Sequence, residues 1–290
     1  MPELPEVETI RRQLAPAITG RRIESVRVLD ERWTRPAPPR EVEQALEGRR
    51  IEAVERRGKY LMMRLEGGGA LAMHLRMTGN LLLDADPSAG EPRYLRAEIR
   101  LEGGRRLLFT DTRRFGQAVV LDDAELEPYF AARLGVEPLS EELTAERIAS
   151  LAAGRRAPLK SFLMNQLGIA GIGNIYADEA LFRAALHPLS PAGSLKAADC
   201  ERLRQGIVEA LAAGLRTGGA SVDDYIDARG DRGTMQDEFL VHTREGKPCV
   251  RCGAEIRRIV VAGRSTYFCP GCQRRLRRSP RRRSRARAAA

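Results

Sequence analysis

Two cysteine pairs near the C-terminal end constrain the fold of this chain more than any other feature. Cys249 and Cys252 are separated by two residues, Cys269 and Cys272 repeat that spacing, and 16 residues lie between the pairs. Four thiolates in this pattern are typical of a closed tetrahedral zinc site with no open coordination position. A segment this short buries little apolar surface, so the metal must stabilise it. The sequence therefore predicts one structural Zn²⁺ in a zinc finger spanning residues 236–273.

The residues between the cysteine pairs are predicted to form a β-hairpin. Ile256, Ile259 and Val261 precede Gly263, and the pattern presents Arg264 near the tip of the hairpin. The fifth cysteine, Cys200, falls in a helical stretch and is expected to be a small buried residue. Paired cysteines in a metal pattern, rather than a disulfide framework, favour a reducing compartment and hence a cytoplasmic protein.

Hydrophobic periodicity predicts a β-sandwich with a leading helix over residues 2–132. Val7, Ile10 and Leu14 recur at helical spacing, and this first helix is expected to end before Pro16. Apolar residues then alternate with polar ones in two hairpins, one over residues 61–77 and one over residues 97–109, each interrupted by glycines. Repeated hairpins with one apolar face should pack face to face.

The second half of the chain has helical spacing. A linker and a first helix, capped by Thr144, are expected over residues 133–154, followed by a helical domain over residues 155–235. Residues 217–233 are rich in Gly, Asp, Ser and Arg, which indicates a mobile loop. The predicted fold class is therefore α+β, with an N-terminal β-sandwich, a C-terminal helical domain and a zinc hairpin.

Charge and length limit the possible partners. The 290 residues suffice for two domains, and no apolar run approaches 18 residues, so no membrane segment is expected. The net charge is +10, but residues 274–290 form an arginine-rich tail that is expected to be disordered and carries most of it. A nucleic-acid surface on the remainder must come from charges gathered on one face.

The N-terminal residues Pro2 and Glu3 form a candidate catalytic pair. If Met1 is removed, Pro2 presents a secondary amine whose reference pKa of about 8 leaves part of it uncharged near neutral pH. Such an amine can form a Schiff base with a sugar aldehyde or acetal carbon, and the adjacent Glu3 can transfer protons. The alternative is structural, because Pro5 and Glu6 also resemble the start of an ordinary helix.

Four further segments contain candidate binding residues. Glycines before Asn174 suggest a helix N-terminus that binds phosphate, although glycines also serve packing at helix corners. The basic turn around Lys59 is either functional or an exposed hairpin end. Residues 74–79 and 111–116 contain Met77 and Phe115, which by periodicity alone would be core residues, and His74 is expected to be structural or a phosphate contact.

Taken together, five motifs in order resemble the formamidopyrimidine-DNA glycosylase family over residues 2 to about 273, beginning with the N-terminal string PELPEVET. The resemblance implies excision of oxidised purines, such as 8-oxoguanine and formamidopyrimidines, from damaged double-stranded DNA, followed by strand cleavage through β,δ-elimination. It implies a monomer with these residues in the site: catalytic Pro2, Glu3, Lys59 and Arg264; DNA-binding His74, Met77, Arg113, Phe115, Lys160, Asn174 and Tyr176; lesion-base contacts Glu6 and Thr217.

Two other functions remain open at this stage. An endonuclease VIII-like glycosylase for oxidised pyrimidines would share the proline, the glutamate and the zinc hairpin, whereas the ELPEVET opening and the long loop after Gly219 favour the purine enzyme. A non-catalytic zinc-containing DNA-binding protein would be favoured if Met1 were retained, because an amide nitrogen at Pro2 could not attack.

Overall fold

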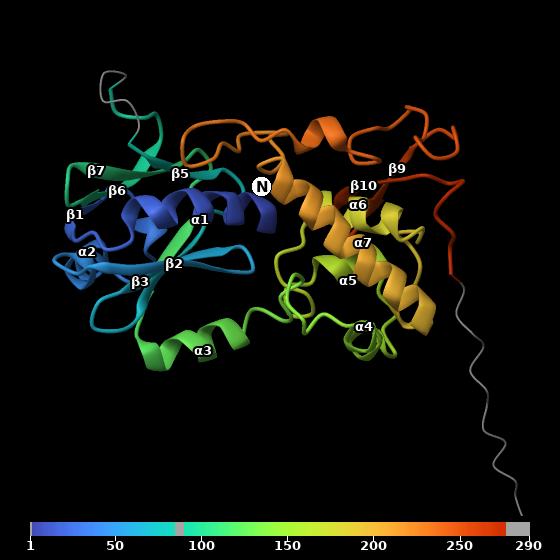
Figure 1. Ribbon diagram of the computed structural model, residues 1–290, viewed down its shortest axis with the longest axis horizontal. Helices are drawn as coiled ribbons and strands as arrows, with labels where there is room; N and C mark the ends of the chain where they lie inside the picture. The colour runs from blue at the N-terminus through green and yellow to red at the C-terminus, as the bar shows by residue number, and fades with distance from the viewer. Residues whose placement is uncertain (1, 85–89, 277–290) are drawn as a thin grey trace, which may run out of the picture.

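The computed structural model describes residues 2–84 and 90–276, which form two lobes joined near the N-terminus (Figure 1). The last residues of the predicted arginine-rich tail, 277–290, lie outside this range, whereas Arg274 and Leu276 bond to the backbone of Ala185 and the hydroxyl of Ser190. No helix in the described part of the chain is long and apolar enough to cross a membrane.

The first lobe is a sandwich of two four-stranded antiparallel sheets, as the hairpin pattern predicts. One sheet has the order β1 (Ile23–Val28), β6 (Leu95–Leu101), β7 (Arg105–Asp111) and β5 (Gly79–Leu83). The other has the order β2 (Ile51–Arg57), β3 (Tyr60–Leu65), β4 (Ala70–His74) and β8 (Gln117–Leu121). The core between them contains the alternating residues Leu61, Met63, Leu71 and Met73 of the first predicted hairpin.

Helix α1 (Leu4–Ile18) begins at the join between the lobes and runs through the first lobe (Figure 1). Leu4 belongs to the core of the second lobe, whereas Val7 and Ile10 belong to the core of the sandwich. The predicted stop before Pro16 is wrong, because the exposed proline disturbs only the last turn and Ile18 extends the buried face. Helices α2 (Pro39–Leu46) and α3 (Asp123–Ala131) complete this lobe and were not anticipated by the hydrophobic pattern.

The second lobe is helical and includes the zinc hairpin. It contains α4 (Ala145–Ala152), α5 (Leu159–Met164), α6 (Asn174–Arg183) and α7 (Ala197–Arg216). As predicted, the Thr144 hydroxyl caps α4 by accepting a bond from the Arg147 N–H, and Cys200 is fully buried. Strands β9 (Arg257–Val261) and β10 (Arg264–Phe268) form the predicted hairpin, which lies against the α6 end of the lobe (Figure 1).

One break in the strand pattern matters for the site. The apolar alternation over residues 71–77 predicts a single strand, but β4 ends at His74, and residues 75–78 turn toward the other sheet. Arg76 adopts the left-handed conformation at φ 57°, which a strand does not allow. Met77 is therefore half-buried in a connection rather than buried in the core.

Candidate active site between the two lobes

The Glu3 carboxylate lies at the N-terminus of α6, in the join between the lobes. Its two oxygens accept bonds from the Gly173 N–H at 2.6 Å and the Ile175 N–H at 2.9 Å. A carboxylate is favourable there, because the first N–H groups of a helix lack partners and the helix dipole is positive at this end. A Cβ on residue 173 would approach the Glu3 Cδ atom to 2.4 Å, so only glycine permits this contact.

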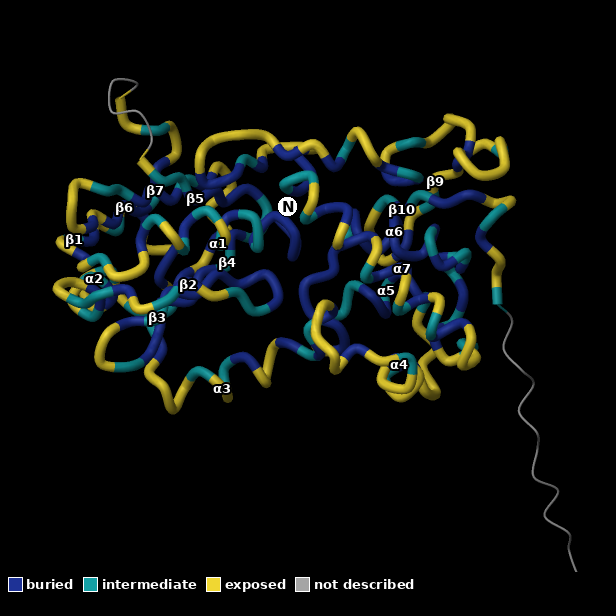
Figure 2. The backbone as a smooth tube through the Cα atoms, viewed as in Figure 1, coloured by how far each residue is buried: buried dark blue, intermediate teal, exposed yellow. Residues whose placement is uncertain are grey.

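Pro2 precedes Glu3 and is buried at the same join. In Figure 2 the backbone beside the N label, between the two lobes, has the dark blue colour of buried residues. The Leu4 N–H donates to the Gly171 carbonyl at 3.0 Å and fixes the terminus against the glycine-rich turn. Beside Glu3 is a cavity of about 170 Å³ that both lobes line. Its lining includes the predicted site residues Glu3, Met77, Asn174 and Arg264, together with Met164, Ile175, Ala220, Val222, Asp223, Tyr225 and His242.

Glu6 lies behind this cavity rather than in its wall. Its carboxylate accepts bonds from the Tyr176 hydroxyl and the Ala220 N–H, both at 2.7 Å, and from the Glu3 N–H at 2.8 Å. Burial, and secondarily the charge of Glu3, raises the pKa of Glu6 above its ordinary value. Glu6 thus connects α1, α6 and the segment after α7. Because its carboxylate bonds to these segments and does not line the cavity, the structure does not place it where the predicted contact with a lesion base would form.

The loop over residues 217–233 is hydrogen-bonded to the first lobe. The composition of the loop alone predicts that it is mobile. The Gln13 amide donates to the Asp227 carboxylate at 2.6 Å, and the Leu83 N–H donates to the Ala228 carbonyl at 2.7 Å. The Thr217 hydroxyl donates to the Ala213 carbonyl at 2.9 Å, so it closes the end of α7 and does not line the cavity. The segment that does line it begins at Ala220.

Lys59 and His74 line a second hollow, of about 350 Å³, where the sandwich meets the linker. Burial lowers the pKa of the Lys59 ammonium, a shift that the charges of Glu3 and Glu6 oppose. Burial also lowers the pKa of His74 to about 3, and its Nδ1 accepts a bond from the Arg76 N–H at 2.9 Å. His74 is therefore neutral at physiological pH and carries its proton on Nε2, where it can donate to an anion.

The turn that carries Lys59 is held by the linker between the lobes. The Glu137 carboxylate accepts bonds from the Gly58 N–H and from the Arg56 guanidinium, the latter at 2.9 Å. Arg56 also lies 3.3 Å from the Glu8 carboxylate of α1. The predicted alternative, an exposed hairpin end, therefore does not describe this turn.

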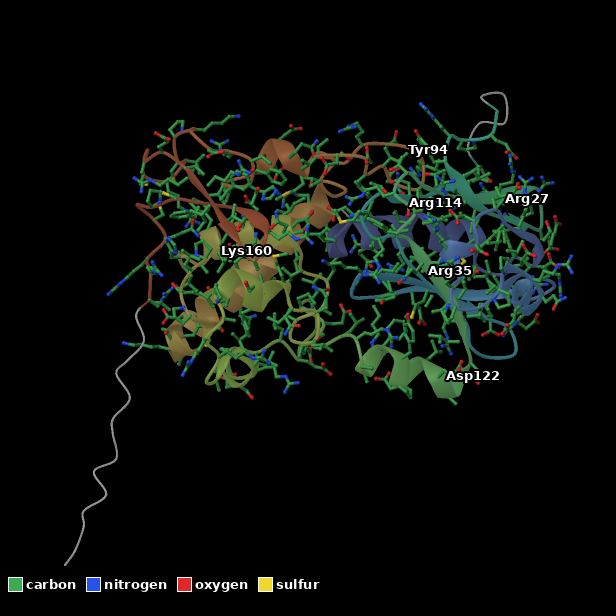
Figure 3. The ribbon with its side chains drawn as sticks, turned by 180° about the vertical axis from the view of Figure 1, so that it is seen from behind. Arg27, Arg35, Tyr94, Arg114, Asp122 and Lys160 are labelled. Atoms are coloured by element: carbon green, nitrogen blue, oxygen red, sulfur yellow. The ribbon has the colours of Figure 1, made fainter. Side chains whose placement is uncertain are left out.

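Lys160 and Tyr176 lie inside the second lobe, with their polar atoms turned toward the protein. Figure 3 labels Lys160 within the helical lobe. Its ammonium is fully buried and donates to the Asp178 carboxylate and the Asn174 carbonyl, both at 2.6 Å. The Tyr176 ring is also fully buried. This inward placement differs from the direct DNA contacts predicted for the two side chains. The spacing of apolar residues around a helix N-terminus does not show which polar side chains turn inward.

His242 is a cavity residue that the sequence pattern did not single out. Its Nδ1 lies 2.8 Å from the second Asp178 oxygen, and its ring packs edge-on against Tyr267 of the zinc hairpin at 5.1 Å between centroids. The Glu179 carboxylate accepts the backbone N–H groups of residues 240–242 and fixes this segment. Asp178 of α6 thus bonds to both Lys160 and His242, and its neighbour Glu179 holds the backbone of His242. No local sequence pattern predicts this arrangement.

The zinc hairpin is attached at the same end of α6. The Asn174 amide donates to the Ser265 carbonyl at 3.1 Å, next to the exposed Arg264 at the start of β10. The Asn174 Oδ1 is buried and has no hydrogen-bond partner among the residues that the structure describes. Arg264, Asn174 and Glu3 therefore face one cavity from three different segments.

The four predicted zinc ligands come together as expected. The sulfur atoms of Cys249, Cys252, Cys269 and Cys272 all lie within 4.8 Å of one another. Two of the sulfur pairs are 3.8 Å and 3.4 Å apart, near the ~3.8 Å that tetrahedral Zn–S bonds of ~2.3 Å require. The residues present therefore fit one structural zinc ion.

Family models match three parts of the chain. The N-terminal domain of formamidopyrimidine-DNA glycosylase matches residues 1–118, its H2TH domain matches residues 134–225, and a zinc finger found in FPG and IleRS matches residues 246–275. With the fold and the site, these matches define the class: a base excision repair DNA glycosylase with a helix-two-turn-helix domain and a structural zinc.

Relatives of full length agree with this class. The chain is 46% identical to the formamidopyrimidine-DNA glycosylase of Chloroflexus aggregans over 275 residues, covering 94% of this chain and 98% of that one. It is 44% identical to the Gluconobacter oxydans protein of the same name, over 94% of this chain and 100% of that one. The chain belongs to the formamidopyrimidine-DNA glycosylase family.

Solved structures of the family share the whole fold. A Lactococcus lactis FPG mutant in complex with Fapy-dG-containing DNA superposes with a TM-score of 0.88 at 34% identity, covering 94% of this chain and 100% of that chain. The MutM (FPG) protein of Thermus thermophilus gives a TM-score of 0.84 at 42% identity, covering 94% of this chain and 98% of that chain.

Proposed function

We propose that this chain removes oxidised purines, including 8-oxoguanine and formamidopyrimidines, from duplex DNA and then cleaves the strand through a Schiff base at Pro2. The observation that carries the proposal is the position of Pro2 and Glu3, buried at the join of the lobes beside a cavity that both lobes line. The Lactococcus lactis FPG is known in complex with abasic-site DNA, and a mutant of it in complex with Fapy-dG-containing DNA, which supports the same substrates here.

The chemistry starts from the extruded nucleotide. After removal of Met1, the Pro2 nitrogen attacks C1′, the bond to the damaged base breaks, and the sugar ring opens to an iminium. Glu3 transfers the proton to and from the ring oxygen, because its carboxylate adjoins Pro2 and is fixed by two N–H groups of the α6 terminus. The iminium acidifies the neighbouring sugar carbon, so the 3′ and then the 5′ phosphate can leave.

We assign the grip on the distorted DNA backbone to four side chains. Lys59, His74, Asn174 and Arg264 lie in the two hollows at the join and offer donors to phosphate oxygens. Lys160 and Tyr176 support the site indirectly: Lys160 donates to the Asn174 carbonyl, and Tyr176 donates to the Glu6 carboxylate. Zinc holds the hairpin that presents Arg264 and takes no part in the bond changes.

The segments around Met77, Arg113 and Phe115 fill the space that the damaged base leaves. Phe115 is half exposed, which is unusual for a large aromatic ring, and Arg113 lies over it at 4.8 Å. The segment beginning at Ala220 covers the extruded base from the other side of the cavity.

Two alternatives are less well supported. An endonuclease VIII-like enzyme for oxidised pyrimidines is disfavoured by the relatives above, which are formamidopyrimidine-DNA glycosylases over nearly their whole length. A non-catalytic DNA-binding protein would not need a buried proline and glutamate beside a cavity. We infer a monomer that acts on chromosomal DNA in the cytoplasm.

Borohydride trapping tests the proposal. The purified protein should form a covalent adduct with 8-oxoguanine duplex when borohydride reduces the iminium, and Pro2→Gly should lose most of the adduct. Mass spectrometry of the intact chain checks that Met1 is absent. No adduct with the wild type, or an undiminished one with Pro2→Gly, contradicts the mechanism, and adducts on oxidised pyrimidines alone favour the endonuclease VIII-like alternative.

A further inference from the structure

The three residues assigned to the vacated space come from two connections that lie side by side. Residues 75–78 lead from β4 to β5, and residues 112–116 lead from β7 to β8, so each connection passes from one sheet to the other. The strands that flank them are paired, with His74 opposite Gln117 in one sheet and Gly79 opposite Asp111 in the other. The two connections therefore start and end at neighbouring positions in both sheets.

One buried carboxylate joins both connections. Asp111 is only 1% exposed, and its Oδ2 accepts bonds from the Phe115 N–H at 2.8 Å and the Gly116 N–H at 2.7 Å. Its Oδ1 accepts a bond from the Arg113 N–H at 3.1 Å and from the Thr78 hydroxyl. Thr78 follows Met77 directly. The Asp111 carboxylate is therefore bonded to the backbone N–H groups of Arg113 and Phe115 and to the residue next to Met77.

Both connections contain backbone that needs such support. Arg76 has φ 57° and Arg114 has φ 59°, and a non-glycine residue in the left-handed region costs of the order of 1 kcal/mol. Arg114 is paired with Asp30, and the Arg76 guanidinium donates to the Gln117 side chain at 2.8 Å. Figure 3 labels Arg114 and Tyr94 on the sandwich lobe. The Tyr94 carbonyl accepts the Asp111 N–H at 3.0 Å.

Both connections pack closely against one aromatic ring. A Cβ on Gly116 would approach the Phe109 ring to 2.4 Å, and one on Gly79 would approach the same ring to 3.0 Å. Phe109 is itself stacked on Trp33 at 5.4 Å between centroids. The two segments thus rest on one aromatic pair and are bonded to one carboxylate.

We infer that Asp111 is a positioning residue that holds Met77, Arg113 and Phe115 as one rigid wedge, so that extrusion of the damaged base depends on it. The inference rests on the proposed function of those three residues. Asp111 itself is buried and does not touch the reacting atoms. Its effect should therefore appear in the step that replaces a stacked base, and not in the chemistry at Pro2.

Asp111→Asn tests this, because the side chain keeps its shape while one of its two acceptor oxygens becomes an NH₂ group that opposes an N–H donor. Single-turnover excision of 8-oxoguanine from duplex should fall at least about tenfold, since charge-assisted bonds are lost. Cleavage of a preformed abasic site, which has no damaged base to unstack, should fall less than about threefold. The fluorescence of 2-aminopurine beside the lesion, which reports unstacking, should rise more slowly.

Two further variants control for misfolding. Thr78→Val removes only the hydroxyl contact and should show a smaller effect with the same selectivity, and Thr78→Ser should restore wild-type rates. Asp84→Asn removes a carboxylate that accepts the Arg106 N–H on the same lobe, away from the wedge, and should leave both rates unchanged.

Equal losses on the lesion and on the abasic site, or no loss on either, would overturn the inference. If the Asp111 variant does not fold, the selectivity of Thr78→Val decides the question in the same way. A wild-type protein that forms no borohydride adduct would instead contradict the proposed function, so the two failures are distinguishable.

Discussion

The Glu3 carboxylate and the Gly173 N–H, 170 residues apart in the chain, lie 2.6 Å from each other. This bond seats the N-terminal residues on the first turn of α6 and joins the two lobes at the cavity. Glycine is required because any Cβ at this position would occupy the space of the Glu3 carboxyl group.

Replacing Gly173 with alanine should therefore displace Glu3. We expect Gly173→Ala to reduce borohydride trapping on 8-oxoguanine duplex by more than about tenfold, the equivalent of one lost bond to a charged group. Gly168→Ala is the matched control, since a Cβ there makes an ordinary 3.4 Å contact. Normal trapping by Gly173→Ala would show that Glu3 functions without its hydrogen bond from the N–H of residue 173.

The buried pair of Lys160 and Asp178 predicts a large stability effect. Asp178→Asn leaves the Lys160 ammonium buried without its counter-charge, which should lower the free energy of unfolding by about 3–5 kcal/mol. The double variant Lys160→Met, Asp178→Asn should recover part of that loss. Urea denaturation measures both, and Asp123→Asn, an exposed partner of Arg64, is the control that should leave the free energy of unfolding close to that of the wild type.

His74 should make the protein sensitive to acid. Its pKa is about 3 in the folded protein and about 6.5 when unfolded, so the unfolded chain binds one more proton between these values. Stability from this residue is complete above pH 6.5 and decreases as the pH falls. Between pH 7.5 and pH 5, wild type should lose up to about 2 kcal/mol more than His74→Gln in urea denaturation; equal losses would contradict the lowered pKa.

Arg264→Ala should weaken binding to lesion DNA and reduce the slope of log affinity against log salt by about 1, while zinc content stays unchanged. The reason is that Arg264 faces the cavity from the exposed start of β10. Arg257→Ala, at the opposite end of the hairpin, is the control and should bind nearly normally. An affinity for Arg264→Ala equal to wild type across a salt titration would exclude the contact.

Removal of zinc should separate the roles of the two lobes. Chelation should release one metal ion per chain and abolish binding of lesion DNA, because the hairpin that carries Arg264 and bonds to Asn174 loses its stabilising ion. The single tryptophan, Trp33, is buried in the sandwich core and should keep its emission spectrum. A shift of that emission together with zinc loss would mean that the metal stabilises both lobes.

Spacing and periodicity in the sequence predicted the four zinc ligands and many of the strands and helices, although not α2 and α3. The catalytic role of Pro2 and Glu3 rests on the resemblance to the family and stays a prediction. The cysteine spacing predicted the zinc hairpin, and the alternation over residues 61–73 predicted two paired strands. These succeed because spacing and local periodicity depend on neighbours in the chain. The same reasoning ended α1 too early and continued β4 through Met77, because local rules do not include the core that extends a helix or the partner sheet that draws a strand away.

Contacts between segments that are far apart in the chain determine which polar side chains face the cavity and which of them support the others. Lys160, Tyr176 and Glu6 carry strong motif signals but are buried, whereas His242 and Asp111 carry weak ones and occupy decisive positions. A buried polar group is placed by partners that are distant in sequence, as Asp178 is for His242 and Thr78 is for Asp111. No local pattern contains those partners, because each pair forms only when segments distant in the chain pack together within a lobe.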